Sequence, residues 1–539
     1  MACAAVDRLG WVSTGALAAA LLAASAGAAS AQAPGGSGSL QEVQCQALAQ
    51  PGRFPATTVA SAKLVPAGGG APAHCEVTAT ISPVAGSRIG VVYRLPGDWN
   101  GKIVGYGGGG WAGNVRLETA ATDLSRGYAT LQTDGGHPSA NAGDASWTAP
   151  GGVPNDVALR DFAYRAVHEM TGVGKQVVAA FYGRPQTRAY FQGCSTGGRM
   201  ALMEAQRFPE DYDGIVSGAP VYSLRVQVAE IYRDWIFAQP GAAITPRHIG
   251  LVHDAVLSAC DAKDGVKDGI LNDPRTCAFD PAVLACKSGQ QPEQCLSPAQ
   301  VEAFRRQYTE VRGQGGAVYV FPYPRGTEPG WLQALNITAD PQRAARARNL
   351  DLRAFMFGDP NFDFAKLDVV RDTPRVRSTE FAKYYEADNP DIRPFLNRGG
   401  KLILWHGFDD QLPSAFGTID YYQRMRAATG AAGAAGTRFF LAPGVLHCGG
   451  GPGANTFDFI AAVDAWVERG TAPERIKGER AARATPAGAD APGVGPRGSA
   501  PAPQQPQAPP MTRPICAYPA LPAYRGQGDA NDERSFDCR

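Results

Sequence analysis

The sequence of 539 residues has no surplus of either charge, because 51 lysines and arginines are balanced by 50 aspartates and glutamates. Without a basic excess the chain cannot neutralise the phosphates of a nucleic acid, so such a partner is not expected. Charged residues are few, at 19%, whereas the 65 glycines and 42 prolines indicate a loop-rich fold. Hydrophobic residues, at 44%, suffice for the core of one large domain with an insertion or of two domains.

The sequence also lacks any Cys-x-x-Cys pair, which argues against a zinc or redox site. Ten of the eleven cysteines follow the N-terminal region, and an even number in an exported chain indicates disulfides. Cys194 and Cys448 are far apart, and they form either a long-range disulfide or two free thiols, with Cys194 as a nucleophile. Pairing the other cysteines with their neighbours predicts Cys45–Cys75, Cys260–Cys277, Cys286–Cys295 and Cys516–Cys538.

Long apolar runs are missing after the N-terminal region, so no membrane partner is expected. At the N-terminus, Arg8 precedes an apolar stretch that ends in Ala29-Ser30-Ala31, which offers the small residues of a cleavage site. Residues 1–31 are therefore predicted to be a signal peptide. A membrane anchor is the alternative, although the stretch is short and rich in alanine. No cysteine lies at the cleavage site, so we expect a secreted or periplasmic protein and not a lipoprotein.

Strands alternate with helices in the first and last parts of the chain, which predicts a parallel α/β sheet. The segment 156–181 has helical apolar spacing without a proline, and a closing helix is expected over 455–468. Strands are expected at 102–106, 128–133, 188–192, 401–405 and 438–441.

The α/β pattern stops near residue 223, where cysteine loops and irregular segments begin, and it resumes near residue 391. The middle region is therefore expected to be an insertion into one domain. The expected division is a first α/β part at 32–222, an inserted domain at 223–390, a second α/β part at 391–482, a disordered linker at 483–512 and a disulfide-closed C-terminal segment at 513–539.

A G-x-S-x-G pattern centred on Ser195 follows the strand at 188–192 and precedes a helix. Such a turn places the serine on a strained, exposed tip, where a base can take its proton. Ser195 is therefore the predicted nucleophile. The alternative is a glycine-rich turn in which the serine is incidental.

The base of such a nucleophile follows the acid in the chain order Ser, Asp or Glu, His. His447 lies in a glycine-flanked loop after a strand, where a catalytic base is expected. His406 ends the previous strand, and it is predicted to line the substrate pocket, with a purely structural role as the alternative. Asp409 and Asp410 follow it, and one of them is expected to orient His447.

An ester hydrolase also needs two N–H groups that stabilise the oxyanion of its tetrahedral intermediate. One is expected from Thr196, the residue after the nucleophile. The other is expected from the glycine run at 107–110, because glycine lets the backbone approach the oxyanion closely. A flexible loop is the alternative interpretation of that run.

Taken together, these residues resemble the tannase and feruloyl esterase family of α/β-hydrolases. The family has a Cys-Ser pair, a distant aspartate and a His-Cys pair, which match Cys194-Ser195, Asp410 and His447-Cys448. The likeness extends from about Cys45 to Ile476 and resumes from Arg513 to Cys538, and within the family it is similar to a bacterial branch that includes a terephthalate monoester hydrolase. Other segments that look like the family are Asp134-Gly135-Gly136-His137, Arg207-Phe208-Pro209 and Ala465-Trp466-Val467-Glu468-Arg469-Gly470.

The resemblance implies an α/β-hydrolase fold whose inserted lid domain covers the active site. It implies a catalytic triad of Ser195, Asp410 and His447, which selects Asp410 over its neighbour. It also implies oxyanion donors at Gly110 and Thr196 and a Cys194–Cys448 disulfide between the nucleophile loop and the base loop.

A glycine-bent loop at 261–270 carries Asp261, Asp264 and Asp268. Calcium binds about 6–8 oxygens, and such a loop can add backbone carbonyls to its carboxylates. An Asp-Gly turn cluster is the alternative. The resemblance implies a structural Ca²⁺ in the lid, with Asp261, Asp264 and Asp268 binding by side chain and Val266 and Ile270 by carbonyl.

The sequence therefore predicts a secreted serine ester hydrolase that acts on small aromatic esters of the hydroxycinnamate or gallate type. Hydrolysis of mono(2-hydroxyethyl) terephthalate is one alternative, but Trp331 is followed by Leu332-Gln333-Ala334-Leu335, without the tryptophan pair expected for that substrate. An acyltransferase, or a non-catalytic, calcium-stabilised binding protein on the same fold, would also fit the pattern.

Overall fold

The computed structural model describes residues 36–111, 113–139, 143–335, 337–338, 355–359, 361–481 and 509–539. The predicted signal peptide and most of the predicted linker lie outside these residues.

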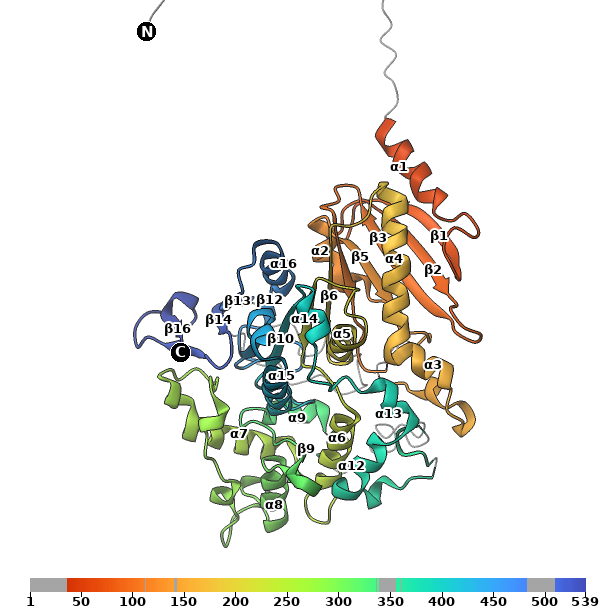
Figure 1. Cartoon of the computed structure of the whole chain (residues 1–539). Coiled ribbons are helices and arrows are strands. Elements are labelled where there is room, and N and C mark those ends of the chain that lie inside the picture. The colour runs from red at the N-terminus through yellow and green to blue at the C-terminus, as the bar shows by residue number, and fades with distance from the viewer. Residues whose placement is uncertain are drawn as a thin grey trace, which may run out of the picture.

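A nine-stranded sheet forms the centre of the molecule, in the order β1-β2-β3-β5-β4-β6-β7-β10-β11 (Figure 1). The strands from β5 to β11 in this order run parallel, whereas β1, β2 and β3 are antiparallel to their neighbours. The predicted parallel sheet and its five predicted strands are thereby confirmed. The strands are β1 Thr57–Val65, β2 His74–Ile81, β3 Ile89–Pro96, β4 Lys102–Tyr106, β5 Ala129–Thr133, β6 Arg188–Cys194, β7 Gly214–Gly218, β10 Lys401–Gly407 and β11 Thr437–Ala442.

The two faces of this sheet pack into two different hydrophobic clusters. In β6, Tyr190 belongs to one cluster and its neighbour Phe191 to the other, and in β10 the same holds for Ile403 and Leu404. Successive side chains of a strand point to opposite faces, so a strand buried on both faces is apolar at nearly every position. This burial explains why these strands are continuous hydrophobic runs in the sequence.

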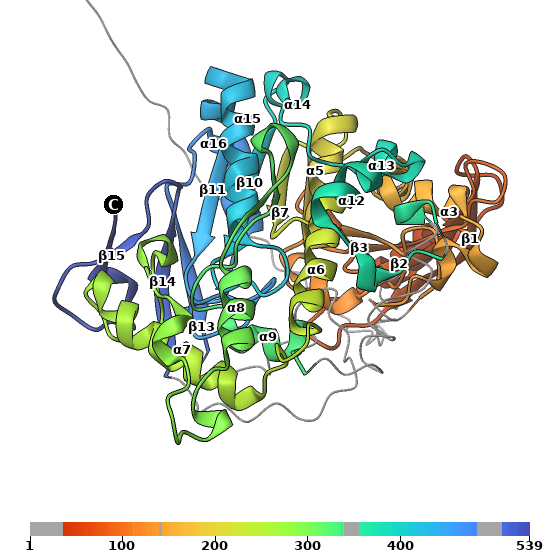
Figure 2. The ribbon, with the colours of Figure 1, turned by 90° about the horizontal axis from the view of Figure 1, so that it is seen from below.

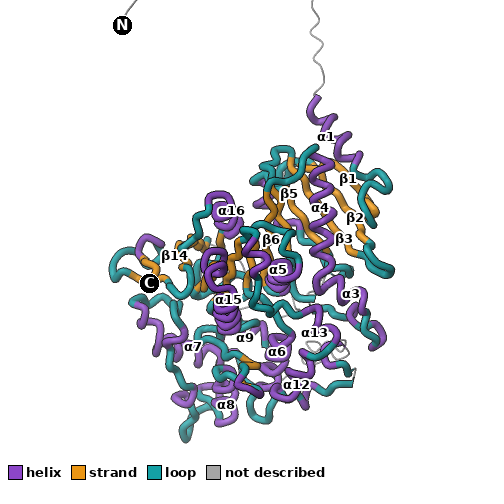
Figure 3. Tube along the Cα trace, in the orientation of Figure 1, coloured by secondary structure: helices purple, strands orange, loops and turns teal. Residues whose placement is uncertain are grey.

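Helices cover both faces (Figure 3). Helices α4 and α5 lie against β3, β5, β6 and β7, while α15 lies against β10 and β11. Helix α16 packs on the other face, where its residues share a cluster with Tyr190 and Ile403. The helices of this part are α1 Gly36–Ala47, α2 Ala121–Ser125, α3 Asp156–Arg160, α4 Ala166–Tyr182, α5 Thr196–Arg207, α15 Ala415–Gly436 and α16 Phe459–Arg469.

The predicted insertion lies between β7 and β10, and its described residues fall into two parts (Figure 2). The first part has its own core around Trp331, whose side chain is fully buried. The second part, from Phe355 to Leu396, belongs instead to the main cluster of the sheet, and α13 lies against α3. The second half of the insertion is therefore packed on the sheet domain, together with Leu224, Val228 and Ala229 at the beginning of the first half. Its elements are α6 Leu224–Phe237, α7 Pro246–Cys260, α8 Pro298–Gln307, β8 Val311–Arg312, β9 Val318–Val320, α9 Glu328–Ala334, α12 Val369–Arg377 and α13 Glu380–Tyr385. Helix α14 (Arg393–Asn397) lies between the predicted boundary at 390 and β10.

The C-terminal segment returns to the body of the molecule. Strand β14 (Met511–Cys516) pairs with β13 (Arg475–Arg480), which pairs with β12 (Thr456–Phe457). Beyond it, Tyr518 N–H donates a hydrogen bond of 2.7 Å to the carbonyl of Phe439 in β11. Strands β15 (Pro522–Tyr524) and β16 (Phe536–Cys538) complete the segment.

Among the residues that the structure describes, five disulfides are present. Four are the local pairs predicted from spacing, with sequence separations of 9 to 30, and the fifth is the Cys194–Cys448 bond that the resemblance implied, with a separation of 254. In the part of the chain that the structure describes, no helix has the length and apolar character to span a bilayer.

Candidate active site

Ser195 forms a sharp turn between β6 and α5. Its backbone dihedrals, φ 62° and ψ −122°, lie outside the regions that non-glycine residues favour, and it is the N-cap of α5. Hydrogen bonds fix the turn on both sides: Ser195 N–H donates to the carbonyl of Gly218 at 3.0 Å, and Val221 N–H donates to the carbonyl of Ser195 at 3.2 Å. This is the strained strand-to-helix geometry expected of a nucleophilic serine.

Glycines let the turn approach its surroundings. A Cβ on Gly193 would lie 2.5 Å from the backbone of Gly197, and a Cβ on Gly197 would lie 2.7 Å from the carbonyl oxygen of Gly108. The nucleophile turn and the glycine run at 107–110 are therefore in direct backbone contact. No larger residue fits at Gly193 or Gly197 without moving the backbone, which explains the glycines of the pattern.

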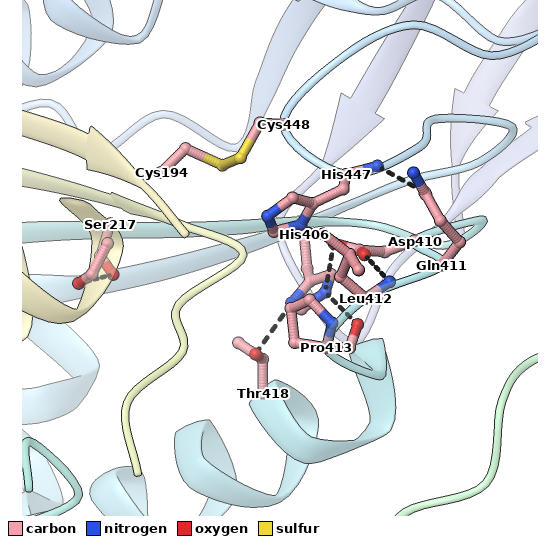
Figure 4. The surroundings of a disulfide bond; sticks show 11 residues. Cys194, Ser217, His406, Asp410, Gln411, Leu412, Pro413, Thr418, His447 and Cys448 are labelled. Atoms are coloured by element: carbon pink, nitrogen blue, oxygen red, sulfur yellow. Dashed lines mark hydrogen bonds and ion pairs between the residues drawn. A yellow bond between two sulfur atoms is a disulfide. The ribbon is translucent and has the colours of Figure 1, made fainter. Parts of the chain in front are cut away.

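The Cys194–Cys448 disulfide places the nucleophile turn beside the loop that carries His447. The Cα atoms of the two cysteines are 5.9 Å apart. Ser195 follows one cysteine and His447 precedes the other, so the two residues flank a single covalent bond. Figure 4 shows this disulfide beside His447. Both are buried, with exposed fractions of 8% and 3%.

The structure brings Asp410 and His447 together. His447 Nδ1 lies 2.8 Å from Asp410 Oδ2, within a buried hydrogen bond (Figure 4). The other carboxylate oxygen, Oδ1, accepts a hydrogen bond of 2.8 Å from Leu412 N–H. A carboxylate at Nδ1 holds the imidazole in the tautomer whose Nε2 can accept a proton.

His406 corrects the sequence prediction, because it does not line a pocket. Its side chain is fully buried beneath Asp410, and its Nε2 lies 3.1 Å from Asp410 Oδ2, the oxygen that also bonds His447. Its Nδ1 lies 2.8 Å from Thr418 Oγ1 at the start of α15. The sequence showed that His406 ends a strand. It did not show that Thr418 of α15 bonds Nδ1 of this histidine and so orients its Nε2 toward Asp410.

The two histidines determine the charge of Asp410. Burial alone would raise the pKa of Asp410, but the charge of His447 and the hydrogen bonds from both histidines outweigh burial and lower the pKa to about 2. Asp410 is therefore ionised at any pH at which the protein would act.

The insertion contacts the loop of Asp410 through residues that no sequence pattern singled out. Gln411 Oε1 accepts a hydrogen bond of 3.1 Å from His447 N–H, and the carbonyl of Gln411 accepts one of 2.6 Å from the hydroxyl of Tyr323. Ser414 donates to the carbonyl of Pro322. In the sequence, only the positions of Gln411 and Ser414 shortly after Asp410 could have indicated that they belong to the site.

Asp409, the neighbouring acid, faces the insertion and not His447. Its carboxylate lies near Gly326, at 3.7 Å from where a Cβ of that glycine would be. Burial raises the pKa of Asp409 to about 7; the charge of Glu328 raises it too, and that of His253 lowers it. His253 and Glu328 themselves pair at 3.0 Å. The preference for Asp410 as the partner of His447 thus agrees with the geometry.

The glycine run begins at the end of β4, beside the nucleophile turn. Gly107 N–H donates to the carbonyl of Gln192 at 2.9 Å, and Gly110 has a φ of 56°, in the left-handed region. Thr196 is the first residue of α5. Both predicted oxyanion donors therefore belong to backbone segments that meet at Gly108 and Gly197.

The loop at 261–270 turns its carboxylates toward backbone N–H groups. Asp261 accepts from Gly269 N–H and Asp264 accepts from Asn272 N–H, both at 3.1 Å. Asp268 pairs with Arg513 of the C-terminal segment at 2.7 Å. Among the residues that the structure describes, no three His, Cys, Asp or Glu side chains form a metal-binding group. The all-oxygen donor set is nevertheless of the kind that calcium prefers.

The chain matches the model of a protein family, "Tannase and feruloyl esterase", over residues 75–539. It is 34% identical over 537 residues to the mono(2-hydroxyethyl) terephthalate hydrolase of Piscinibacter sakaiensis, with 87% of this chain and 85% of the relative covered. It is 32% identical over 443 residues to a probable feruloyl esterase B-2 of Aspergillus flavus, with 75% and 80% covered.

Among solved structures, feruloyl esterase B from Aspergillus oryzae superimposes with a TM-score of 0.79 at 25% identity. The superposition covers 93% of this chain and 100% of the esterase chain. A further esterase from Aspergillus oryzae superimposes with a TM-score of 0.80 at 26% identity, covering 92% and 100%. These likenesses agree with the α/β-hydrolase fold that the sequence predicted. The chain belongs to the tannase and feruloyl esterase family of carboxylic ester hydrolases.

Proposed function

We propose that the protein hydrolyses esters of small aromatic acids by acyl transfer, with Ser195 as nucleophile, His447 as general base and Asp410 as the group that orients the base. The single observation that carries the proposal is the buried pair of Asp410 and His447, at 2.8 Å, next to a disulfide whose other cysteine precedes Ser195. Nucleophile, acid and base follow one another in the chain order of α/β-hydrolases.

In the first half-reaction, Ser195 Oγ attacks the ester carbonyl carbon while His447 Nε2 takes the hydroxyl proton. The oxyanion of the tetrahedral intermediate accepts hydrogen bonds from Gly110 N–H and Thr196 N–H. His447 then gives its proton to the leaving alcohol oxygen, and an acyl-serine remains. In the second half-reaction, water gives a proton to His447 and attacks the acyl carbon, and the free acid leaves as His447 returns the proton to Ser195.

The acyl group is proposed from the family. The relatives are named for feruloyl esters, tannins and a terephthalate monoester, which are all esters of an aromatic carboxylic acid. A hydroxycinnamate or gallate ester is the first candidate. Mono(2-hydroxyethyl) terephthalate is the second, favoured by the 34% identity to its hydrolase.

The test uses Ser195→Ala with methyl ferulate, methyl gallate and mono(2-hydroxyethyl) terephthalate as substrates. We expect the loss of the nucleophile to lower kcat by at least about 10⁴-fold on whichever ester the wild type turns over, with the melting temperature unchanged. A fluorophosphonate probe should add its mass to the Ser195 peptide of the wild type only. An active Ser195→Ala variant would overturn the assignment of Ser195 as the nucleophile. A wild type that is inactive on these esters and unlabelled by the probe would favour a non-catalytic binding protein. Acyl transfer that outpaces hydrolysis when an alcohol acceptor is present would instead identify an acyltransferase.

We propose that the protein is exported, in line with its five disulfides and the predicted N-terminal signal. We also propose a structural calcium ion at the loop of Asp261, Asp264 and Asp268, together with the carbonyls of Val266 and Ile270. The oxygen donor set supports this ion, and closure of the loop by Cys260–Cys277 would hold the donors together. No catalytic step depends on it.

A further inference from the structure

The carbonyl oxygen of Trp111, directly after the proposed oxyanion residue Gly110, is held by two side chains. His137 Nε2 lies 2.8 Å from this oxygen, and Trp147 Nε1 lies 3.1 Å from it. His137 is buried, with 2% of its surface exposed, and its ring stacks on that of Trp147 at a centroid distance of 3.7 Å. Trp147 Nε1 lies equally far, at 3.1 Å, from the carbonyl of Asp144 and is shared between the two oxygens. A carbonyl oxygen has two lone pairs, so both side chains can bond that of Trp111 at once and fix its position.

A tight turn brings His137 to this place. Gly135 and Gly136 have φ values of 71° and 91°, and Asp134 Oδ1 accepts from Gly136 N–H at 2.8 Å. A Cβ on Gly136 would lie 2.4 Å from Cβ of Asp161, so the second glycine is also required by space. The Asp134-Gly135-Gly136 run thus turns the chain after β5 and places His137 under the glycine run.

Backbone contacts hold the same loop on both sides of Trp111. After it, Gly113 and Ser139 exchange two backbone hydrogen bonds of 2.8 and 3.3 Å. Before it, Gly107 is bound to Gln192, and Gly108 is in contact with Gly197 of the nucleophile turn. Gly110 therefore lies between fixed backbone groups on both sides, at Gly107 and Gly108 before it and at Trp111 and Gly113 after it. The carbonyl of Trp111 is the one nearest to Gly110 in sequence.

We propose that His137 and Trp147 are positioning residues of the oxyanion hole: by binding the Trp111 carbonyl they fix the peptide groups around Gly110 so that its N–H is directed at the oxyanion. The inference rests on the proposed function, because Gly110 has a role only if an acyl transfer takes place. Preorganised donors stabilise a transition state more than a substrate, so a displaced donor lowers kcat more than it raises KM.

The protonation state of His137 suits this role. To bond a carbonyl, Nε2 must carry the proton. Burial lowers the pKa of His137 to about 4, so the ring is neutral above that pH and carries one proton. Its contribution is therefore constant over the neutral range, unlike that of a catalytic base.

The test compares His137→Phe, which keeps an aromatic ring against Trp147 but removes the N–H, with His137→Gln, which restores a donor, and with Trp147→Phe. The probes are the best ester substrate of the wild type and an aryl boronic acid, which binds serine hydrolases as a tetrahedral adduct. We expect His137→Phe to lower kcat by about tenfold or more, to change KM by less than about threefold and to weaken boronate inhibition by the same factor as kcat. Trp147→Phe should have a smaller effect, and His137→Gln should recover part of the loss.

Two further features separate this role from a structural one. The kcat loss in His137→Phe should be the same at all pH values from about 6 to 9, and the double variant with Trp147→Phe should lose less than the product of the single losses, because both side chains serve one oxygen. The matched control is His168→Phe, since His168 also stacks on an aromatic ring, Phe208, at 4.0 Å, but its Nδ1 bonds Asp211 and not the Trp111 carbonyl. Fluorophosphonate titration of active enzyme corrects for any unfolded fraction.

The proposal is overturned if His137→Phe and Trp147→Phe keep the wild-type kcat per titrated serine, or if kcat falls while boronate affinity does not. A wild type that is inactive and unlabelled would instead refute the proposed function, so the two failures are distinguishable.

Discussion

The Cα atoms of Cys194 and Cys448 lie 5.9 Å apart, joined by a disulfide that closes 254 residues of chain. Each cysteine is next to a residue of the proposed triad. The bond therefore ties the nucleophile turn to the base loop, although the two are far apart in the sequence.

The Cys194→Ser/Cys448→Ser double variant should lose activity as well as stability. Removing a native disulfide costs about 2–5 kcal/mol of folding free energy, and here it also frees the base loop to move relative to Ser195. We expect kcat to fall by about tenfold or more at a temperature at which the variant is still folded. The matched control is Cys286→Ser/Cys295→Ser, which removes the disulfide between two cysteines of the insertion that are 9 positions apart. It should lower the melting temperature without lowering kcat. Equal effects of the two double variants on kcat would contradict this role of the Cys194–Cys448 bond.

His406→Leu should impair the base although His406 does not touch substrate. His406 and His447 both bond Oδ2 of Asp410, at 3.1 and 2.8 Å. Without His406, burial raises the pKa of Asp410 and its carboxylate is held less firmly. We expect kcat to fall by about tenfold or more and KM to change little, because the carboxylate supports His447 mainly in the transition state.

His406→Gln keeps a donor at the Nε2 position and should recover most of the activity of His406→Leu. A His406→Leu variant with the wild-type kcat would show that His406 only fills space beneath Asp410.

Asp409→Asn should stabilise the protein above neutral pH. In the unfolded chain an aspartate ionises with a pKa of about 3.9, whereas the pKa of Asp409 in the folded state is raised to about 7 by burial. Between these values the folded state holds a proton that the unfolded state has lost, so the free energy of unfolding decreases as pH rises through this window. Asparagine does not ionise, so the free energy of unfolding of the variant does not decrease in this window.

The measurement for Asp409→Asn is the melting temperature of variant and wild type from about pH 4 to pH 8. The advantage of the variant should be absent near pH 4, grow up to about pH 7 and then stay constant. An advantage of equal size at both ends would indicate a packing effect, and no advantage at the upper end would mean that His253 neutralises Asp409 fully.

Most of the sheet could be predicted from the sequence because its strands are buried on both faces. Strands such as β6 and β10 are continuous apolar runs, and such runs are visible without knowledge of the fold. Helix α15 could not be predicted in the same way, since its second half is mainly alanine and glycine and lacks an apolar periodicity.

The residues of the candidate site also differ in how far the sequence alone could predict them. Ser195 and His447 were found because each lies in a short local pattern that follows a strand, whereas Asp410 was preferred to Asp409 through the resemblance to the family. The orientation of His406 depends on Thr418 of α15, 2.8 Å from its Nδ1, and on the carbonyl of Pro413, 3.2 Å from its Nε2. The roles of His137 and Trp147 depend on how two loops meet near Trp111. These contacts form only when separate elements pack together, and neither periodicity nor spacing encodes them.

Calcium should stabilise the protein if the loop of Asp261, Asp264 and Asp268 binds it. A ligand that binds only the folded state adds about 2.7 kcal/mol at about 100 times its Kd, so the melting temperature of chelator-treated protein should rise with added Ca²⁺. Asp264→Asn removes one proposed ligand and should abolish the rise. Asp280→Asn is the matched control, because Asp280 also lies in the insertion but forms an exposed pair with Arg305. A rise that persists in Asp264→Asn would place the ion elsewhere. The absence of any rise in the wild type would show that the loop does not bind Ca²⁺. The loop would then be held by its own hydrogen bonds and by the ion pair of Asp268 with Arg513 of the C-terminal segment, at 2.7 Å.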